Sequence, residues 1–285
     1  MPELAVTMTQ KAEGIIMLGI FKKALVATAS IAVVALSTSA WAGPTLDRIM
    51  SEKKLVVGVA PWNKFVLLNP KTNQYEGLIV DDIRNLEAMT GIKVELVNTT
   101  WSGLVAGLQA GKWDVIMSGL GATPERATAV AFGEAFGYLS STAMVRADSP
   151  VRSLADLDKD GNTVSVVSGT AAHQFAQRTF KKAKVSSLSD TGAAVLEVMQ
   201  GRATAYVGDS VSNELRAQER PTELRNVKFA SNETEWTSMN HAVRYSDLDL
   251  LTFLDTYIRS MKLRGWYRTL ADKWNLPPEL ATGPH

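Results

Sequence analysis

The sequence contains no cysteine, and this absence removes several kinds of chemistry at once. Disulfide bonds, thiolate metal sites and cysteine nucleophiles all require a sulfur that the chain does not have. A cysteine that could carry a lipid after a secretion signal is excluded for the same reason. Any function of this protein must therefore be carried by other side chains.

Histidine is also scarce, with only His173, His241 and His285 in the chain. The three are far apart in the sequence, and none stands in a HExxH-like spacing that would indicate a zinc site. The glycine-rich loops that hold nucleotide phosphates and the GxSxG motif of serine hydrolases are also missing. We therefore expect no metal, no cofactor and no catalytic residue.

The chain has no excess of charge of either sign. Its formal net charge is +1, and outside residues 1–42 the basic and acidic residues are equal in number. Proteins that bind nucleic acid carry a basic patch or block that neutralises phosphates. No such block occurs here, so nucleic acid is not expected as a partner.

The longest stretch without a charged residue lies near the start of the chain. Lys22 and Lys23 precede an apolar run over 24–36, which ends in a small-x-small pattern at Ala40 and Ala42. This order is typical of a secretory signal peptide. A membrane anchor is the alternative, but the run is short for a span of about 20 residues. We expect cleavage after Ala42, a periplasmic mature protein, and Met17 as the true start.

One stretch has the composition of a small anion site. Residues 115–117 form an apolar run that predicts a buried strand, and Ser118, Gly119 and Gly121 follow in a turn that a ligand could approach closely. Thr123-Pro124-Glu125 then predicts the start of a helix, with its positive dipole end. Arg126 adds a planar fork suited to a carboxylate. An ordinary strand-to-helix turn with a surface arginine fits this stretch equally well.

Alternating strand and helix patterns occur twice in the chain. Residues 54–117 and 163–207 each give strands and helices in an order that predicts a parallel sheet. The long helical tail after Trp236 suggests that the chain returns to its first half. We expect an α/β protein with two lobes: 43–140 and 238–285 form the first, and 141–237 form the second. The two crossings, near 138–142 and 236–240, would form a hinge.

The chain resembles the periplasmic solute-binding proteins of ABC importers, in particular the polar amino-acid family. The most specific mark is Ala122-Thr-Pro-Glu-Arg126 after its glycine turn. The other matching segments, in order, are 55–59, Phe65, 69–77, 81–82, 101–104, 108–114, 168–170, 207–209 and 265–274. Together they cover nearly all of the mature chain. The resemblance implies the two-lobed type II binding-protein fold.

The resemblance also implies roles for single residues. Arg126 would bind the α-carboxylate of an amino acid, with backbone N–H groups near Gly121 and Thr170. Asp209 would pair with the α-ammonium, helped by the Gly119 carbonyl. Trp62 and Trp101 would sandwich the ligand side chain, and Ser118 belongs to the same turn. A zwitterion does require a fork donor and a carboxylate on opposite walls.

Each assignment has a structural alternative. Asp209 could simply cap the helix that follows it, and Trp101 could be core packing, as we expect for Trp113. The sequence departs from the family at three places. Gly121 replaces a serine or threonine, Ala171 replaces a second threonine after Thr170, and Pro61-Trp-Asn-Lys64 replaces a loop of the Tyr-Pro-Pro type. These departures predict a pocket that is less polar than usual.

We therefore expect a binding protein, not an enzyme, that captures an amino acid or similar zwitterion by hinge closure. It would deliver the ligand to an inner-membrane ABC permease and act as a monomer. The alternative is a periplasmic dehydratase of the prephenate or arogenate type, for which Glu134 or Glu214 would have to serve as a general acid. A sensory module acting in trans is a third possibility.

Overall fold

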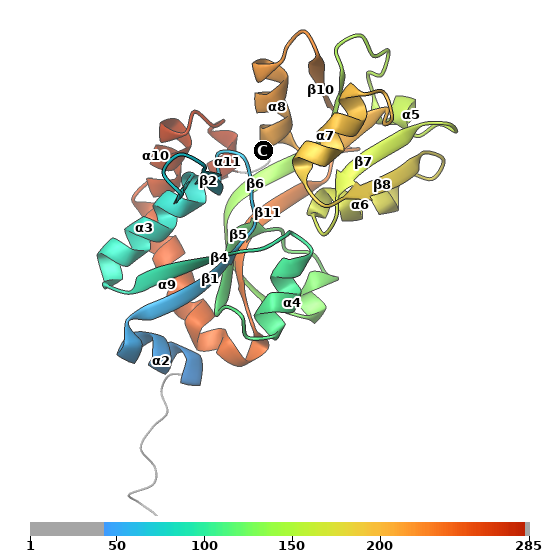
Figure 1. Ribbon diagram of the computed structural model, residues 1–285. Helices are drawn as coiled ribbons and strands as arrows, with labels where there is room; N and C mark the ends of the chain where they lie inside the picture. The colour runs from blue at the N-terminus through green and yellow to red at the C-terminus, as the bar shows by residue number, and fades with distance from the viewer. Residues whose placement is uncertain (1–42, 283–285) are drawn as a thin grey trace, which may run out of the picture. The chain divides into compact units, whose positions relative to one another are not determined.

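The computed structural model describes residues 43–282, which belong to one compact unit. The predicted signal peptide and the extension before it lie outside the described residues. Within residues 43–282, no helix has the length and apolar character needed to cross a membrane. Figure 1 shows these residues as an α/β fold in which one sheet is covered by helices.

The main sheet has the strand order β4-β1-β5-β11-β6-β9-β7-β8, with β10 beside β6. Its strands are β1 (Lys54–Val59), β4 (Lys93–Asn98), β5 (Val115–Leu120), β6 (Ala131–Arg146), β7 (Thr163–Val167), β8 (Lys184–Leu188), β9 (Ala205–Asp209), β10 (Leu224–Lys228) and β11 (Trp236–Val243). A separate hairpin is formed by β2 (Leu67–Asn69) and β3 (Gln74–Glu76). The parallel pairs are β1 with β4 and β5, and β7 with β8 and β9, as the two α/β repeats predicted.

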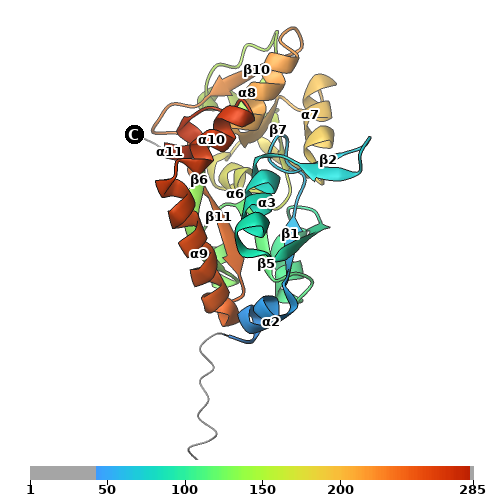
Figure 2. The same cartoon turned by 90° about the vertical axis from the view of Figure 1, so that its left-hand side faces the viewer.

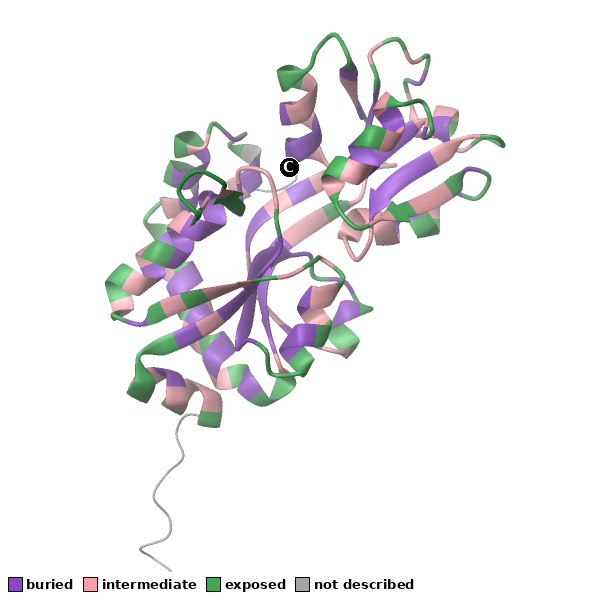
Figure 3. Cartoon of the chain, viewed as in Figure 1, coloured by how far each residue is buried: buried purple, intermediate pink, exposed green. Residues whose placement is uncertain are grey.

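The helices follow the strands in the expected alternation. They are α2 (Pro44–Glu52), α3 (Leu78–Thr90), α4 (Gly103–Gln109), α5 (Leu154–Leu157), α6 (Ala171–Thr179), α7 (Thr191–Met199), α8 (Ser210–Glu219), α9 (Leu248–Leu263), α10 (Trp266–Lys273) and α11 (Glu279–Thr282). In Figure 2, α9 runs beside β11 and β6, with α10 and α11 at its end. Figure 3 shows buried strands inside and helices with exposed outer faces.

Two strands connect the halves of the sheet. The 16-residue β6 pairs with β11 from Ala131 to Ser140 and with β9 from Ser141 onward. The strand therefore changes partners at Ser141. β11 also pairs with β5. β6 and β11 therefore both begin or end in the half of the sheet that contains β1, β4 and β5, and they connect it to the other half. Any functional group at the Ser140–Ser141 step lies where the two halves meet.

Trp113 is a core residue, as predicted. Its side chain is 3% exposed and fills space that two glycines leave open. A Cβ on Gly107 would lie 1.9 Å from this ring, and one on Gly58 would lie 2.6 Å from it. The indole thus fixes α4 against β1 at the base of the first half.

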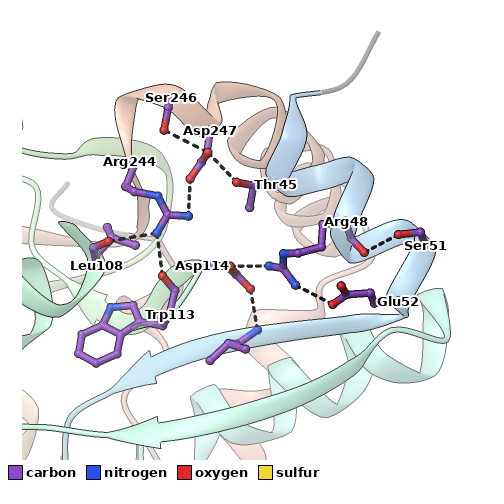
Figure 4. Close-up of polar contacts among 11 residues, drawn as sticks. Thr45, Arg48, Ser51, Glu52, Leu108, Trp113, Asp114, Arg244, Ser246 and Asp247 are labelled. Atoms are coloured by element: carbon purple, nitrogen blue, oxygen red, sulfur yellow. Dashed lines mark hydrogen bonds and ion pairs between the residues drawn. The ribbon is translucent and has the colours of Figure 1, made fainter. Parts of the chain in front are cut away.

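The base of this half is tied together by charged side chains (Figure 4). Asp114 accepts a 2.6 Å hydrogen bond from Arg48 and a 3.0 Å bond from the Val56 amide. Arg244 donates to the carbonyls of Leu108 and Trp113 and pairs with Asp247 at 2.7 Å. These contacts join α2, β1, the end of α4 and the start of α9.

The predicted helix start after Thr123 is wrong. After Thr123 and Pro124 the chain forms only a 3₁₀ turn, Arg126–Thr128, and then enters β6. The local cap does form, since the Thr123 hydroxyl accepts from the Arg126 amide at 3.3 Å. The helix stops because the chain is needed as a long paired strand.

Candidate functional site

A cavity of about 80 Å³ lies where the two halves of the sheet meet. Its lining includes seven of the eight residues predicted for the site: Trp62, Trp101, Gly119, Gly121, Arg126, Thr170 and Asp209. The eighth, Ser118, is fully buried and does not line the cavity. Its hydroxyl accepts a 3.0 Å hydrogen bond from the Ala60 amide and so joins the end of β5 to the end of β1.

Arg126 forms the cationic wall of this cavity. Its guanidinium donates to the Gly121 carbonyl at 2.7 Å and to the Gly169 carbonyl at 2.6 Å. The side chain therefore bridges the turn after β5 and the turn after β7. Burial lowers its pKa to about 10, and none of the ion pairs within residues 43–282 includes Arg126. A buried cation with only carbonyl partners retains the capacity to bind an anion.

Gly121 has a packing reason to be glycine. A Cβ at this position would lie 2.3 Å from Cγ2 of Thr237 and 3.4 Å from Nη1 of Arg126. Thr237 on β11 thus occupies the space that a serine or threonine at position 121 would need. The missing side-chain donor is the result of contact between two segments that are 116 positions apart in the sequence numbering.

Asp209 forms the anionic wall. It is the N-cap of α8, and its Oδ1 accepts from the Ser212 amide at 2.8 Å. Its Oδ2 accepts a 3.1 Å hydrogen bond from Nε1 of Trp62, which also lines the cavity. Burial raises the pKa of this carboxyl, and the Ser212 and Trp62 donors act in the opposite direction. Capping and lining the cavity are thus both properties of the same side chain.

The two indoles do not face each other in this structure, and their role as a sandwich around a ligand side chain stays a prediction. The rings of Trp62 and Trp101 meet edge to face, with centroids 5.6 Å apart and an interplanar angle of 80°. One face of Trp62 is covered by Phe65, whose ring stacks at 3.8 Å. No slot for a ligand remains between rings that touch at right angles. The pair instead forms a wall at one end of the cavity.

Several lining residues were missed by the sequence analysis. These are Leu139, Ser140, Ser141, Ala171, Ala172, Thr191, Tyr206, Gly208 and Thr237. Some had a local indication, since Ala171 and Ala172 directly follow the predicted site residue Thr170, and Ala171 is one of the departures from the family. Tyr206 and Gly208 lie in an apolar strand that reads as core. Ser140, Ser141 and Thr237 reach the cavity because β6 and β11 pass side by side from one half of the molecule to the other. No local sequence pattern encodes this pairing.

A larger chamber of about 700 Å³ adjoins this cavity on the other side of the indole wall. The two share Trp62, Trp101, Thr191, Tyr206 and Asp209. The residues found only in the outer chamber are Pro61, Asn63, Leu67, Asn98, Thr99, Thr100, Ser189, Asp190, Gly192, Ser212, Arg216 and Glu219. Both halves of the molecule contribute to its lining.

Residues 55–277 match the bacterial extracellular solute-binding proteins, family 3. The chain belongs to this family. An ancestral amino acid-binding protein, AncCDT-1, described as a precursor of cyclohexadienyl dehydratase, has 33% sequence identity and a TM-score of 0.73. That match covers 81% of this chain and 98% of the ancestral protein. The fold is therefore that of the two-lobed type II periplasmic binding proteins.

Two curated relatives differ in activity. The ABC transporter arginine-binding protein 1 of Escherichia coli is 24% identical over 203 residues, 71% of this chain and 82% of that protein. The cyclohexadienyl dehydratase of Pseudomonas aeruginosa is 25% identical over 178 residues, 62% of this chain and 66% of the enzyme. Similarity to the family is thus compatible with binding and with catalysis, and the site itself must separate them.

Proposed function

We propose that this protein binds a free amino acid or a similar small zwitterion between its two lobes and delivers it to an ABC permease. One observation carries the proposal. Arg126 and Asp209, neither of them in an ion pair within the described residues, line the same cavity from different segments. The carboxylate of a zwitterion can pair with the guanidinium of Arg126, and its ammonium can pair with the carboxylate of Asp209.

In this proposal the α-carboxylate of the ligand lies on the guanidinium of Arg126. The α-ammonium lies at Asp209, near the backbone of Gly119, which also lines the cavity. Gly121 and Thr170 contribute backbone groups at the carboxylate end. The ammonium competes with the Trp62 indole N–H for the Asp209 carboxylate, and a charged donor gives the stronger hydrogen bond.

We further propose the lobe boundaries 43–140, 141–237 and 238–285, with hinges near 138–142 and 236–240. The change of partner in β6 at Ser141 supports the first hinge, and the pairing of β11 with the same stretch supports the second. A ligand favours the closed arrangement over the open one because only the closed arrangement lets it contact both lobes at once.

The secretory signal predicted over residues 17–42 and the family membership support a periplasmic location. The permease partner is proposed on the same family basis. We propose that the mature protein is a monomer, which size-exclusion chromatography with light scattering would test directly.

The decisive test is a thermal-unfolding screen of amino acids and small carboxylates. At 100 times its Kd, a specific ligand stabilises the folded state by about 2.7 kcal/mol. Arg126→Ala should abolish this stabilisation and leave the ligand-free unfolding temperature close to that of the parent protein. Unchanged affinity of Arg126→Ala in calorimetry would contradict the assignment of the carboxylate site.

The dehydratase alternative requires an acid poised over a substrate ring. Neither carboxylate considered from the sequence lines the cavity, because Glu134 pairs with Arg259 at 3.0 Å and Glu214 accepts from Gln218 and Asn226. Asp209 is the one carboxylate in the cavity lining, and it accepts hydrogen bonds from Trp62 and Ser212. We propose that the protein is not an enzyme. Formation of phenylpyruvate from prephenate by the purified protein would reverse this conclusion.

A further inference from the structure

The inner cavity continues into a larger space. The inner cavity has a volume of about 80 Å³, and the chamber beyond Trp62 and Trp101 has about 700 Å³. The two spaces share lining residues, among them Tyr206 and Asp209. The part of a larger ligand that lies beyond its carboxylate and amine can therefore enter the outer chamber.

The outer chamber contains a half-buried arginine that forms no ion pair within residues 43–282. Arg216 lines it, and its Nε is buried with no hydrogen-bond partner among the described residues. The ion pairs within residues 43–282 use the neighbouring Arg220, which lies 3.6 Å from Glu223, but not Arg216. A buried donor that is left unpaired costs free energy, and an anion from a ligand would remove that cost.

The helix α8 places its charged groups in a row. Asp209, Ser212, Arg216 and Glu219 recur at intervals of three and four residues, so they share one face of the helix, and all four line the chamber. Arg216 is seven residues beyond Asp209, which corresponds to about 10 Å along a helix axis. Side chains lean toward the helix N-terminus, so the guanidinium is closer to Asp209 than that.

The remaining acids of the chamber do not cancel this cation. The Asp190 carboxylate is used as the N-cap of α7, where it accepts from the Ala193 amide at 2.9 Å and from Ser189 at 3.0 Å. Glu219 is exposed at the end of α8, where water and salt screen its charge. The charges that a ligand would meet in order are therefore Arg126, Asp209 and Arg216.

We propose that the outer chamber is a second ligand subsite, in which Arg216 binds a carboxylate that the ligand carries several bonds beyond its amine. The inference rests on the proposed function, because it places the first carboxylate on Arg126 and the amine at Asp209. The ligand class is an amino acid with two carboxylates, the second at the end of a side chain or of a substituent on nitrogen. Trp62 and Trp101 lie beside the connecting atoms.

Calorimetry with a graded ligand set tests this assignment. The set contains L-alanine, L-arginine, L-glutamate, L-2-aminoadipate, γ-L-glutamylglycine and N-(3-carboxypropyl)-L-alanine. We expect one of the dicarboxylates to bind most tightly, and the last compound separates substitution on nitrogen from substitution on the side chain. Arg216→Gln should weaken that ligand at least tenfold and change the affinity for alanine less than twofold.

Arg220→Gln is the matched control. It removes the same charge from the same helix, but Arg220 lines only the neighbouring groove between α7 and α8 and not the chamber. Its affinities should equal those of the parent protein. Arg216→Lys retains a cation and should keep part of the preference for dicarboxylates, which preserves the test if Arg216→Gln fails to fold.

Several results would overturn the inference. Tighter binding of arginine than of every dicarboxylate would do so, as would equal losses in Arg216→Gln and Arg220→Gln. If Arg126→Ala abolishes binding of the whole set while Arg216→Gln is neutral, the proposed function stands and the second subsite fails. If no member of the set binds, both fail together.

Discussion

At the scale of single residues, the molecule contains several polar groups whose burial changes their chemistry. Arg126 and Asp209 are two, and Asp82 is a third that lies outside the site. Asp82 is 2% exposed and accepts hydrogen bonds from Tyr257 at 2.7 Å and from Trp266 at 2.8 Å. These neutral donors join α3 to α9 and α10. They do not fully offset the cost of burying a carboxylate, which raises the pKa of Asp82 to about 6.

This shift predicts a pH dependence of stability. The folded protein binds the Asp82 proton more tightly than the unfolded chain does, so its contribution favours folding at low pH. That contribution is lost as the pH rises from about 4, the unfolded value, through about 6. The full effect is about 3 kcal/mol, at 1.36 kcal/mol for each unit of pKa difference.

Asp82→Asn should remove this term while keeping an acceptor for the phenol and indole donors. Urea unfolding between pH 4 and pH 7 should show the variant gaining stability relative to the parent protein as the pH rises. Asp81→Asn is the control, since it leaves the carboxylate of Asp82 in place and should retain the parent slope. Parallel curves for Asp82→Asn and the parent would contradict the assignment.

At the scale of elements, side chains from one segment satisfy the ends of others. Thr170 and Asp209 cap α6 and α8 and also line the cavity, so the starts of these helices position the site. Arg244, directly after β11, joins separate segments at the base of the first half. Its guanidinium satisfies two carbonyls near the end of α4 and the carboxylate of Asp247, which is 3% exposed on its side chain.

Arg244→Met should therefore destabilise the protein strongly. It leaves the Asp247 carboxylate buried without its cation, and breaking a buried pair in this way costs about 3 kcal/mol. Urea unfolding should show that loss, and ligand affinity should stay unchanged because Arg244 lies away from the cavity. Arg146→Met removes an arginine from the exposed pair with Asp148 and should cost less than about 1 kcal/mol. Equal losses in the two variants would argue against the buried network.

At the scale of the whole molecule, two side chains of the first proposed lobe donate hydrogen bonds to the second lobe at the site. Arg126 donates to the Gly169 carbonyl at 2.6 Å. The Trp62 indole, from the loop after β1, donates to Asp209 at 3.1 Å and to Ser212 at 3.0 Å, both at the start of α8. The Trp62 contacts help to hold the lobes together without a ligand and so favour the closed arrangement.

Trp62→Phe should open the ligand-free protein. The change removes the indole N–H but retains a ring to stack on Phe65. Small-angle X-ray scattering should show a larger radius of gyration before ligand is added and a larger contraction after it. Trp101→Phe is the matched control, because its indole donates to the Pro61 carbonyl within the same lobe, at 3.3 Å. Identical scattering from both ligand-free variants would show that the bond does not control closure.

The sequence by itself determined the parts of this protein that local patterns control. The apolar run over 115–117 predicted β5, and the alternating patterns over 54–117 and 163–207 predicted the two α/β repeats, because side-chain periodicity reflects local backbone geometry. The caps at Thr170 and Asp209 follow from residue type and position. Family motifs supplied Arg126 and the two indoles as candidates.

The tertiary structure decided what depends on segments that are distant in sequence. The Thr-Pro-Glu start became a 3₁₀ turn because β6 must pair with β11, and Gly121 is small because Thr237 lies against it. Three other features arise where β6 and β11 connect the two halves of the molecule. They are the contact of Trp62 with Asp209, the near-perpendicular indole rings and the chamber that Arg216 lines. Local propensity cannot encode such contacts, because their partners are set by the register of strands that cross the molecule.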